Sequence, residues 1–373
     1  MDRVKVGIVG GGQLGRMLTE AARPLGREVT VIDPGADCPA AQAGAEQIQA
    51  SFTDADAVLK LASRVDVVTW EIEHINADAL MGLPVPVEPS PKTLSIIKDK
   101  LYQKRMLVDA GIPVADFMDL NSEKLDVDMH SAFGAFGNVI VKTRTGGYDG
   151  RGNMVVTPEN WQELLAQFGS TPLYAEKIEH FQKELAVIIA RDVRGTIAQY
   201  PVVETIHENN ICNLVLAPAN IDPRIQAVAE DIAHETASVL EGAGVFAIEM
   251  FLTEDDKVIV NEVAPRVHNS GHHTIEANRT SQFEQHIRAI TGLPLGSTTA
   301  VSPAVMINIL GERNGKVALT GQDKALAFAG THLHLYGKAS TKVARKMGHI
   351  TVLADSVSEA YKIAIVARKE LTI

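Results

Sequence analysis

The sequence predicts an α/β protein whose first region contains a parallel sheet and whose later regions are richer in strands. Residues 4–9 form a short, β-branched apolar run, which is typical of a buried parallel strand. Three glycines follow, and apolar side chains then recur at helical spacing from Leu14 until Gly26, where a helix would stop. Apolar runs at residues 28–32 and 65–70 complete a strand–helix–strand pattern, which indicates an α/β unit with a parallel sheet.

The remainder of the chain predicts two further domains. A proline cluster at residues 84–91 marks a boundary near residue 98, and one lysine-rich helix is expected over residues 93–110. In the middle region, Asp222 and Pro223 open a helix, and the expected strands are residues 139–141, 173–178, 184–190, 196–203, and a hairpin of 245–252 with 257–264. A small C-terminal domain is expected from short strands at residues 304–310, 332–336 and 349–353 and a helix from residue 355. The predicted domains are therefore residues 1–98, 99–298 and 299–373.

Composition and charge narrow the classes of function. The chain has 373 residues, with 35 basic and 46 acidic side chains and a net charge of −11. That balance leaves no general electrostatic footprint for nucleic acid or for an anionic membrane. Cys38 and Cys212 are too few for a disulfide framework or a cysteine-rich zinc site. The sequence has no signal-peptide pattern and no apolar run long enough to cross a membrane, so we expect a cytoplasmic protein.

The first chemical motif is Gly10-x-Gly12-x-x-Gly15, which follows a predicted strand, opens a predicted helix and is followed later by Asp33. This is the dinucleotide-binding fingerprint in its expected context, and the amides at a helix N-terminus suit a phosphate. Taken alone, the motif favours a nicotinamide enzyme. The alternatives are that these glycines bind another phosphate-bearing ligand or serve only tight packing.

A second glycine-rich segment covers residues 146–152 and contains four glycines with a tyrosine, an aspartate and an arginine. Such a loop can approach a ligand closely and can move between open and closed states. Lys142 ends the strand before the loop, so its ammonium group is placed to meet a phosphate beneath it, with Arg151 as a second cation. The alternative is a surface turn. No Walker A pattern occurs in the sequence, so any nucleotide is held by another fold.

The predicted hairpin brings two carboxylates face to face. If residues 254–257 form its loop, Thr253 faces Val258 and Glu249 faces Glu262. Opposed carboxylates repel each other, and burial raises that cost. A divalent cation between them removes the conflict, and Mg²⁺ prefers oxygen ligands. Asn261 points to the other face unless the strand bulges, and the alternative to a metal site is a register slip that leaves one glutamate in water.

Residues 265–273 follow the hairpin directly and concentrate hydrogen-bonding groups. His268 and His272 have the spacing of metal ligands on a helix, but Pro265 and Gly271 favour a loop. Without cysteines or further ligands at zinc-motif spacing, an anion or small-substrate site is a better hypothesis than zinc. Nearer the C-terminus, the sequence has a cluster of cationic residues: Lys338, Lys342, Arg345 and Lys346. This cluster is either a solvated face or a binding site for a substrate phosphate.

With these motifs together, the sequence resembles the ATP-grasp superfamily and, within it, the 5-(carboxyamino)imidazole ribonucleotide synthase family, the ATPase subunit of phosphoribosylaminoimidazole carboxylase. The resemblance covers nearly the whole chain and rests on residues 10–17, 144–152, 261–272 and 345–349, which read GGGQLGRM, RTGGYDGRG, NEVAPRVHNSGH and RKMGH. It implies an ATP-grasp fold with an N-terminal Rossmann-like pre-ATP-grasp domain and a small C-terminal β-rich domain. Residues 339–344 depart from the family, which has Arg-Pro-Gly there in a stretch one residue shorter, so we expect a remodelled grip on the substrate phosphate.

The resemblance implies a ligase reaction of purine biosynthesis. ATP phosphorylates bicarbonate to carboxyphosphate, which breaks down to carbon dioxide, and the exocyclic amine of 5-aminoimidazole ribonucleotide attacks the carbon dioxide to give a carbamate. The implied metal is Mg²⁺, or Mn²⁺ in its place, at Glu249 and Glu262. A homodimer and a transient hand-off to the mutase that follows in the pathway are also implied, with no nucleic acid or membrane partner.

The resemblance also implies a role for each matching residue. ATP contacts would come from Lys100, Lys142, Gly147, Tyr148, Asp149, Gly150, Arg151, Gly152, Asn153, Glu176, Lys177, Ile178, Glu179, Glu184, His207, Asn261 and Glu262. Bicarbonate and carboxyphosphate would be handled by Arg266, His268, Tyr148, Arg151 and Lys338. The ribonucleotide would be bound by Gln13, Leu14, Glu73, Asn269, Ser270, Lys338 and Arg345.

Three other functions compete with this one. A nicotinamide-dependent oxidoreductase would explain the first glycine motif, but it leaves the second loop and the paired glutamates without a role. A non-catalytic ATP-binding regulator would not need Arg266, His268 and Lys338 together. The nearest alternative is an ATP-grasp ligase that acts on a different acceptor amine.

Overall fold

A computed structural model describes residues 4–147 and 152–373. The N-terminal region is a four-stranded sheet in the order β3-β2-β1-β4, and all of its pairings are parallel, which confirms the predicted unit. Its strands are β1 (Lys5–Val9), β2 (Glu28–Asp33), β3 (Glu46–Gln49) and β4 (Val67–Trp70), and its helices are α1 (Gln13–Ala22), α2 (Pro39–Gln42), α3 (Ala55–Ala62) and α4 (Ala77–Leu80). The sequence did not predict β3, because its residues EQIQ carry no apolar run.

Two helices, rather than the single expected helix over residues 93–110, lead out of this region. They are α5 (Pro91–Lys98) and α6 (Lys100–Asp109), so the prediction of one continuous helix was wrong. Asp99 has φ −102° and ψ 105°, which is extended backbone, and its side chain accepts the N–H groups of Leu101 and Tyr102 at the start of α6. The break therefore exists because Asp99 caps the second helix instead of continuing the first.

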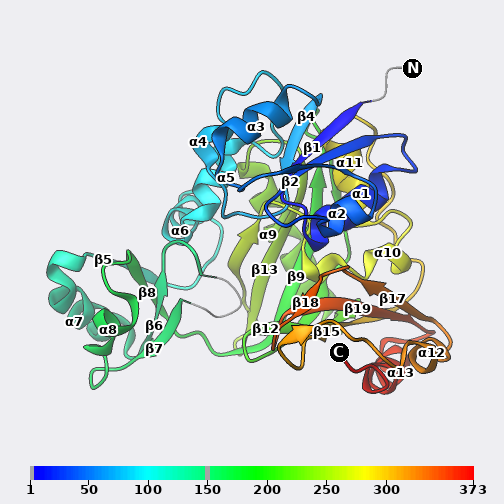
Figure 1. Cartoon of the computed structure of the whole chain (residues 1–373). Coiled ribbons are helices and arrows are strands. Elements are labelled where there is room, and N and C mark those ends of the chain that lie inside the picture. Colours follow the sequence, from blue (N-terminus) through cyan, green and yellow to red (C-terminus); the bar gives the residue numbers. More distant parts are fainter. Residues whose placement is uncertain (1–3, 148–151) are drawn as a thin grey trace.

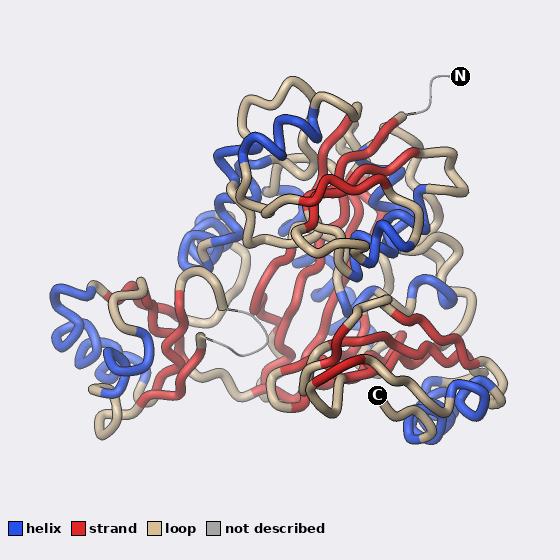
Figure 2. The backbone as a smooth tube through the Cα atoms, viewed as in Figure 1, coloured by secondary structure: helices blue, strands red, loops and turns tan. Residues whose placement is uncertain are grey.

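A small lobe extends from the rest of the molecule (Figure 1). Its antiparallel sheet has the order β5-β8-β6-β7. The elements are β5 (Phe117–Leu120), the 3₁₀ turn Ser122–Lys124, α7 (Leu125–Phe136), β6 (Val139–Thr143), β7 (Asn153–Val156), α8 (Glu163–Phe168) and β8 (Leu173–Lys177). The second glycine-rich segment joins β6 to β7 in the sequence, so its described ends belong to this lobe, and the tube of Figure 2 shows the lobe apart from the main sheet.

The main body is built on a nine-stranded sheet in which β10 pairs with β9 beside the order β14-β13-β9-β11-β12-β15-β19-β17. Its strands are β9 (Phe181–Arg191), β10 (Ile197–Gln199), β11 (Val203–Glu208), β12 (Ile211–Ala217), β13 (Gly244–Thr253), β14 (Val258–Ala264), β15 (Ala304–Leu310), β17 (Thr331–Leu335) and β19 (Lys346–Leu353). The expected single strand over residues 196–203 was wrong: it is divided into β10 and β11 around Pro201, which has no N–H to donate. The predicted C-terminal strands β15, β17 and β19 continue the sheet of the middle region instead of forming a sheet of their own.

The helices of the main body cover both faces of this sheet. They are α9 (Pro223–Val239), α10 (Thr274–Ala277), α11 (Gln282–Ile290), α12 (Gln322–Leu326) and α13 (Val357–Lys369), with a 3₁₀ turn at Asn269–Gly271 and a short strand pair, β16 (Gly315–Lys316) with β18 (Ser340–Thr341). Asp222 caps α9 as predicted, with its side chain accepting the Arg224 N–H. One apolar cluster joins α1 of the N-terminal region to the main sheet through Leu18, Phe283 and Val245, so these two regions share a core.

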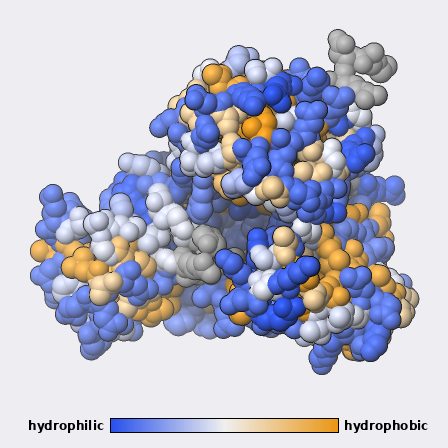
Figure 3. Space-filling view, viewed as in Figure 1, coloured by the Kyte–Doolittle hydropathy of each residue, from blue (hydrophilic) through white to orange (hydrophobic). Residues whose placement is uncertain are grey.

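The three parts meet around one hollow. In the space-filling view the junction of the N-terminal region, the small lobe and the C-terminal region is recessed and mainly hydrophilic (Figure 3). Across the two described ranges, no helix has both the length and the apolar character that a membrane span requires.

Candidate functional site

The paired glutamates lie opposite each other on the predicted hairpin. Glu249 on β13 is the register partner of Glu262 on β14. The predicted partner of Val258 was wrong, however: it is Leu252, not Thr253. A bulge between Glu249 and Met250 corrects the difference, since Met250 pairs with Val260 and Asn261 is the extra residue. The pairing of the carboxylates therefore depends on the bulge.

The surroundings of this pair shift the pKa values of the two carboxyl groups in opposite directions. Burial and the charge of Glu262 raise the pKa of Glu249 to about 7. Burial acts to raise the pKa of Glu262 as well, but Lys100 outweighs it, with its Nζ 2.7 Å from Glu262 Oε2, and the pKa of Glu262 is lowered. One carboxylate thus keeps a cationic partner while the other meets a like charge.

These residues fit a magnesium ion that is shared with a nucleotide. Mg²⁺ in phosphoryl-transfer sites is bound through one or two carboxylates, and substrate phosphates and water supply the remaining ligands. Within the part of the chain that the structure describes, no group of three His, Cys, Asp or Glu side chains could hold a metal ion by itself. The Glu249–Glu262 pair with its unfavourable charge is therefore suited to a metal that arrives with ATP, and not to a metal caged by protein alone.

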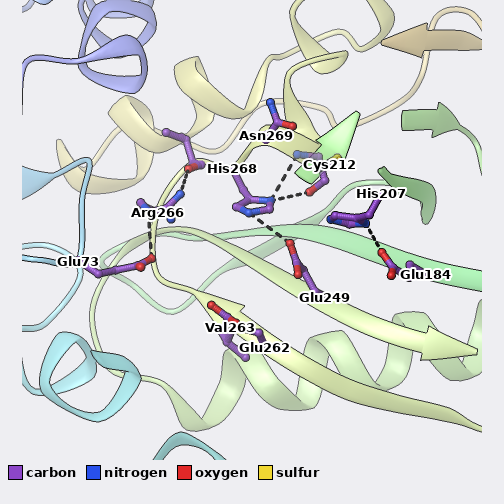
Figure 4. A network of polar contacts seen from close by, with 12 residues as sticks. Glu73, Glu184, His207, Cys212, Glu249, Glu262, Val263, Arg266, His268 and Asn269 are labelled. Carbon is purple, nitrogen blue, oxygen red and sulfur yellow. Dashed lines mark hydrogen bonds and ion pairs between the residues drawn. The ribbon is translucent and has the colours of Figure 1, made fainter. Parts of the chain in front are cut away.

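The loop after β14 brings an arginine and a histidine to the same place (Figure 4). Arg266 Nε lies 3.0 Å from Glu73 Oε1, and His268 Nε2 lies 3.3 Å from Glu249 Oε1. The Ser270 N–H donates to His268 Nδ1 at 3.3 Å, so this nitrogen is the acceptor. Burial, followed by the charge of Arg266, holds the pKa of His268 well below its usual value. A neutral ring with an acceptor at Nδ1 carries its proton on Nε2, which faces Glu249.

On the small lobe, Lys142 is held by Glu176, with Nζ 2.9 Å from Oε1. The other oxygen of Glu176 lies 3.0 Å from the Nζ of Lys104 on α6. Lys104 and Glu176 are 2% and 3% exposed, so this ion pair is almost dry. Burial acts to raise the pKa of Glu176, but the two lysines outweigh it and lower that pKa, whereas burial lowers the pKa of Lys104. The sequence did not single out Lys104, although it lies one helical turn after Lys100 on the same helix.

Glu184 and His207 form an ion pair across neighbouring strands of the main sheet, through Oε2 and Nδ1 (Figure 4). Burial acts to lower the pKa of His207, but the hydrogen bond to Glu184 and the charges of Glu184 and Glu249 together outweigh it, so the pKa of His207 is raised. A register shift in β11 lies between Ile206 and His207, where it re-aims the histidine. Glu184 and His207, both predicted to contact ATP, therefore lie together.

On the opposite side, the N-terminal and C-terminal regions meet through two predicted substrate residues. The Nζ of Lys338 donates to Gln13 Oε1 at 2.7 Å and to the Lys346 carbonyl at 2.5 Å. Arg345 donates to the Ser340 carbonyl at 2.8 Å. Leu14 is a member of the core cluster around α1, so any ligand contact from this residue uses its backbone and not its side chain.

Some predicted site residues lie elsewhere. Ser270 is fully buried and its hydroxyl bonds to His268 Nδ1 at 2.9 Å, so it supports the histidine and does not face a substrate. The Asn269 amide is paired reciprocally with Asn308, at 3.0 and 2.7 Å. Both side chains are therefore engaged within the protein, and their expected contacts with the ribonucleotide stay predictions.

The second glycine-rich loop is described only at its ends. Gly147 and Gly152 lie close together, and the Thr143 N–H donates to the Gly152 carbonyl at 2.8 Å. Asn153 follows in β7 as the register partner of Lys142. The predicted contacts of Tyr148, Asp149, Gly150 and Arg151 lie outside the described residues.

The inter-lobe segment 176–179 follows the prediction in position. It runs from the end of β8 on the small lobe toward β9 on the main sheet. The Lys177 N–H donates to the Asp116 carbonyl at 2.9 Å and its Nζ lies 3.0 Å from Glu179 Oε1. Ile178 and Glu179 therefore form the connection between the lobes.

The altered stretch before Arg345 forms a tight turn. Ser340–Thr341 pair with Gly315–Lys316 as a short antiparallel strand, and Ala344 has φ 67°, in the left-handed region. The Ala344 N–H donates to the Gly311 carbonyl at 2.8 Å. Lys342, predicted as a replacement for a phosphate-binding arginine, is exposed on the outer side of this turn.

The first glycine motif is closed by the protein's own carboxylates. Glu71 accepts the N–H groups of Gly12 and Gly15, and Asp33 accepts the N–H of Gly11 at 3.1 Å. A phosphate at the start of α1 would need the same amides. Internal carboxylates therefore occupy the amides that a dinucleotide phosphate would use, which favours the packing alternative for these glycines.

The fold and the site define an ATP-grasp ligase, and comparisons with known proteins agree. The ATP-grasp domain family matches residues 105–283, the ribonucleotide synthetase preATP-grasp domain matches residues 3–98, and the phosphoribosylaminoimidazole carboxylase C-terminal domain matches residues 304–362. The structure of an N5-carboxyaminoimidazole ribonucleotide synthetase from Thermotoga maritima superposes with a TM-score of 0.89 at 44% identity and covers 99% of each chain.

The chain belongs to the N5-carboxyaminoimidazole ribonucleotide synthase family. The synthase of that name from Pseudomonas aeruginosa is 41% identical over 97% of this chain and 98% of its own length. The N5-carboxyaminoimidazole synthase of Aspergillus clavatus, solved with ADP and 5-aminoimidazole ribonucleotide, has a TM-score of 0.91 at 38% identity and covers 98% of this chain and 99% of that chain. The phosphoribosylaminoimidazole carboxylase of Ogataea methanolica is 43% identical over 96% of this chain, which spans only 68% of that longer protein.

Proposed function

We propose that this chain catalyses the ATP-dependent carboxylation of 5-aminoimidazole ribonucleotide to N5-carboxyaminoimidazole ribonucleotide in purine biosynthesis, with bicarbonate as the carbon source. The observation that carries the proposal is the meeting of two sets of side chains in one hollow. Lys100, Lys142 and the Glu249–Glu262 pair are suited to the phosphates of ATP, while Gln13 with Lys338 offers polar groups to a ribonucleotide. Arg266 pairs with Glu73 of the N-terminal region and His268 with Glu249 of the hairpin, and carboxyphosphate would form beside them.

The ATP side works by charge neutralisation and positioning, which dominate phosphoryl transfer. Lys142 and Lys100 already hold their ammonium groups against carboxylates, so they are oriented before ATP binds. Glu249 and Glu262 would hold Mg²⁺, which when bound neutralises charge on the transferring phosphoryl group. By the family resemblance, residues 147–153 would cover this region, where excluding water would protect an intermediate that hydrolyses readily.

Arg266 and His268 would handle the bicarbonate-derived groups. A bicarbonate oxygen attacks the γ-phosphorus, ADP departs, and the resulting carboxyphosphate splits into carbon dioxide and phosphate. Arg266 is a fixed cation for these anions. His268 carries its proton on Nε2, so it acts as a hydrogen-bond donor to the carboxyphosphate oxygens and not as a base.

The competing oxidoreductase has no support, because internal carboxylates use the amides that a dinucleotide would need. The ligase hypothesis is tested by ADP release with Mg²⁺-ATP and bicarbonate, with and without 5-aminoimidazole ribonucleotide. Strong stimulation by the ribonucleotide is expected. Absence of stimulation, with ATP still bound, would keep the ATP-grasp class and reject this acceptor in favour of another amine.

Two variants separate the steps. His268→Ala is expected to lower the ATPase rate at saturating ribonucleotide, because carboxyphosphate loses a donor. Lys338→Ala is expected to raise the KM for the ribonucleotide and to leave the KM for ATP unchanged, because Lys338 contacts Gln13 and lies on the acceptor side. Equal effects of Lys338→Ala on both KM values would place this lysine outside the acceptor site.

Further parts of the proposal concern assembly and location. We propose a homodimer, a transient hand-off of the unstable carbamate to the mutase that consumes it, Mg²⁺ or Mn²⁺ as the metal, and a cytoplasmic location. Family resemblance supports each of these. Sedimentation of the pure protein at several concentrations tests the dimer, and a single sharp monomer boundary at micromolar concentration would reject it.

A further inference from the structure

Glu71 is a buried carboxylate that the reaction does not use directly. It follows β4 immediately, its N–H donates to the Val9 carbonyl at 3.1 Å, and the residue is only 4% exposed. Its two oxygens accept different amides at the start of α1: Oε1 accepts the Gly12 N–H and Oε2 accepts the Gly15 N–H, the latter at 2.6 Å. The carboxyl group therefore lies at the helix N-terminus: burial raises its pKa, while the two amides and the helix dipole favour the ionised form.

The glycines of the motif are needed to admit this side chain. A Cβ on Gly10 would lie 2.4 Å from the Cγ of Glu71, and one on Gly12 would lie 2.7 Å from its Oε1. A Cβ on Gly15 would lie 2.8 Å from the Gly10 carbonyl oxygen, which would push apart the turn that surrounds the carboxylate. In a dinucleotide site the same glycines let the backbone approach a pyrophosphate. Here they let it approach Glu71.

Gln13 connects this arrangement to the substrate side. It lies between the two residues whose amides Glu71 holds, and its Oε1 accepts from Lys338 at 2.7 Å. Two residues after Glu71, Glu73 pairs with Arg266 at 3.0 Å. The segment after β4 therefore supports the acceptor side of the hollow at two points.

We propose that Glu71 is a positioning residue which takes the place of a phosphate in the glycine loop, and that it thereby sets the position of Gln13 for the ribonucleotide and excludes dinucleotides from the loop. The inference rests on the proposed function for its kinetic consequence. Its structural part, an internal anion that holds the loop, stands apart from any reaction. Loss of the carboxylate leaves a cavity beside two amide donors that a small exogenous carboxylate can enter.

The kinetic test compares Glu71→Ala with the wild type. The KM for 5-aminoimidazole ribonucleotide is expected to rise on the order of tenfold to a hundredfold. Loss of Glu71 would displace Gln13, and small displacements of a positioning group change kinetic constants by factors of this size. The KM for ATP and the ribonucleotide-independent ATPase rate are expected to change less than about twofold, since Glu71 contacts none of the ATP-side residues. Sodium formate is expected to restore the KM of Glu71→Ala, whereas sodium chloride at equal ionic strength is not.

Asp54→Ala is the matched control. Asp54 is also a carboxylate that accepts two helix amides, those of Asp56 and Ala57 at the start of α3, but it is exposed. Its replacement is expected to lower thermal stability without changing the KM for the ribonucleotide and without rescue by formate. A purely structural role for Glu71 predicts the same pattern for Glu71→Ala, and that result would overturn the proposal.

Gly12→Ala approaches the same contact from the glycine side and covers the case in which Glu71→Ala does not fold. Gly12 has φ −77° and ψ −149°, and the atoms nearest to an added Cβ all belong to Glu71, with Oε1 at 2.7 Å. Gly12→Ala is expected to raise the ribonucleotide KM in the wild type and to add little in the Glu71→Ala background. Full additivity, or an unchanged KM in Gly12→Ala, would reject the proposal.

If the wild type shows no ribonucleotide-dependent turnover, formate stabilisation of Glu71→Ala in a thermal melt still tests the internal anion, and its absence would reject that part.

Discussion

Glu176 holds two ammonium groups in an almost dry position, Lys142 at 2.9 Å and Lys104 at 3.0 Å. Charges taken out of water are stabilised only while their partners remain. The carboxylate also joins α6 to the small lobe, because Lys104 lies on the helix and Glu176 on β8. This residue therefore connects the position of the small lobe to Lys142, for which we propose a role in binding the ATP phosphates.

Glu176→Gln is expected to destabilise the protein by about 3–5 kcal/mol, because it leaves two buried cations without a counter-charge. The control is Glu241→Gln, which breaks a pair with Lys92 in which the two side chains are 67% and 54% exposed and which is expected to cost less than about 1 kcal/mol. Urea denaturation of both variants measures the difference. Equal losses in the two variants would contradict a buried, mutually dependent cluster.

Glu249 is expected to make the metal-free protein less stable as the pH rises. Its pKa is about 7 in the folded protein and ordinarily 4.5, so between these values the folded state keeps a proton that the unfolded state has lost. The stability from this proton is complete below about pH 4.5 and is lost as the pH rises through 7. The free energy of unfolding of the wild type should fall on the order of 2 kcal/mol over this range relative to Glu249→Gln.

Urea titrations in EDTA at several pH values between 5 and 8 measure this difference. The comparison with Glu249→Gln removes the contribution of every other titrating group that the two proteins share. Parallel pH curves for the two proteins would show that the Glu262 charge does not reach Glu249 in the free enzyme.

Residue types and spacing pointed to the opposed glutamates, to Lys142 and to the segment 265–273, because each stands next to a recognisable element, whereas the roles of Arg266 and His268 came from the family resemblance. Glu71 and Lys104 were not predictable in the same way. Their partners, Gly12 and Glu176, are distant in sequence, and only the fold brings each pair together. Likewise, the glycine motif looks the same in sequence whether an external phosphate or an internal carboxylate fills it.

At the scale of elements, the break between α5 and α6 orders the ATP side. Asp99 caps α6, and its carboxylate is bound by Arg144 through Nε and Nη2 at 3.0 and 2.6 Å. The Lys100 N–H donates to the Arg144 carbonyl at 2.8 Å, so the strand end at the second glycine loop and the start of α6 are fixed together. Periodicity could not reveal the break, because the buried Leu94, Ile97 and Leu101 continue at helical spacing across it.

Asp99→Ala is expected to cost about 2–3 kcal/mol, of which about 1 kcal/mol is the lost cap and the rest the lost charge-assisted bonds. The KM for ATP should also rise, because Lys100 and Arg144 lose their common anchor. Asp99→Asn keeps an acceptor for the cap, so it should lose less stability yet still raise the KM. Asp222→Ala removes the cap of α9 and should leave the KM for ATP unchanged. An unchanged KM in Asp99→Ala would separate the helix cap from ATP binding.

In the hairpin, the sequence predicted which two glutamates are opposite each other but not the turn length or the bulge that place them there. Counting residues back from the turn placed Glu249 opposite Glu262, yet the turn is one residue longer than assumed and Asn261 makes up the difference as a bulge. Bulges commonly lie beside active sites, where they re-aim a side chain. No local pattern distinguishes a long turn followed by a bulge from a shorter turn without one.

At the scale of the whole molecule, the main sheet crosses the boundary between the middle and C-terminal regions. β12 pairs with β15, and β15 pairs with β19, so the last three strands depend on the middle region for a neighbour. One core cluster combines Leu214 of β12 with Val305, Ile350 and Ala364 of the C-terminal region. The acceptor side likewise needs both ends of the chain, since Gln13 and Lys338 meet only in the complete fold.

We therefore expect that a fragment of residues 1–298 does not fold into a stable unit, even though it contains every predicted ATP contact. Removing residues 299–373 would leave β12 with an unpaired edge and expose Leu214, Val215 and Ala217, which the C-terminal strands cover. Co-expression of fragments 1–298 and 299–373 is expected to restore a soluble complex with ATPase activity, because all buried contacts can then form. Thermal melts and size-exclusion chromatography of each fragment and of the pair measure this. A fragment 1–298 that is soluble and unfolds cooperatively by itself would show that the shared sheet is not required, and that the C-terminal region folds as an independent domain docked against the rest.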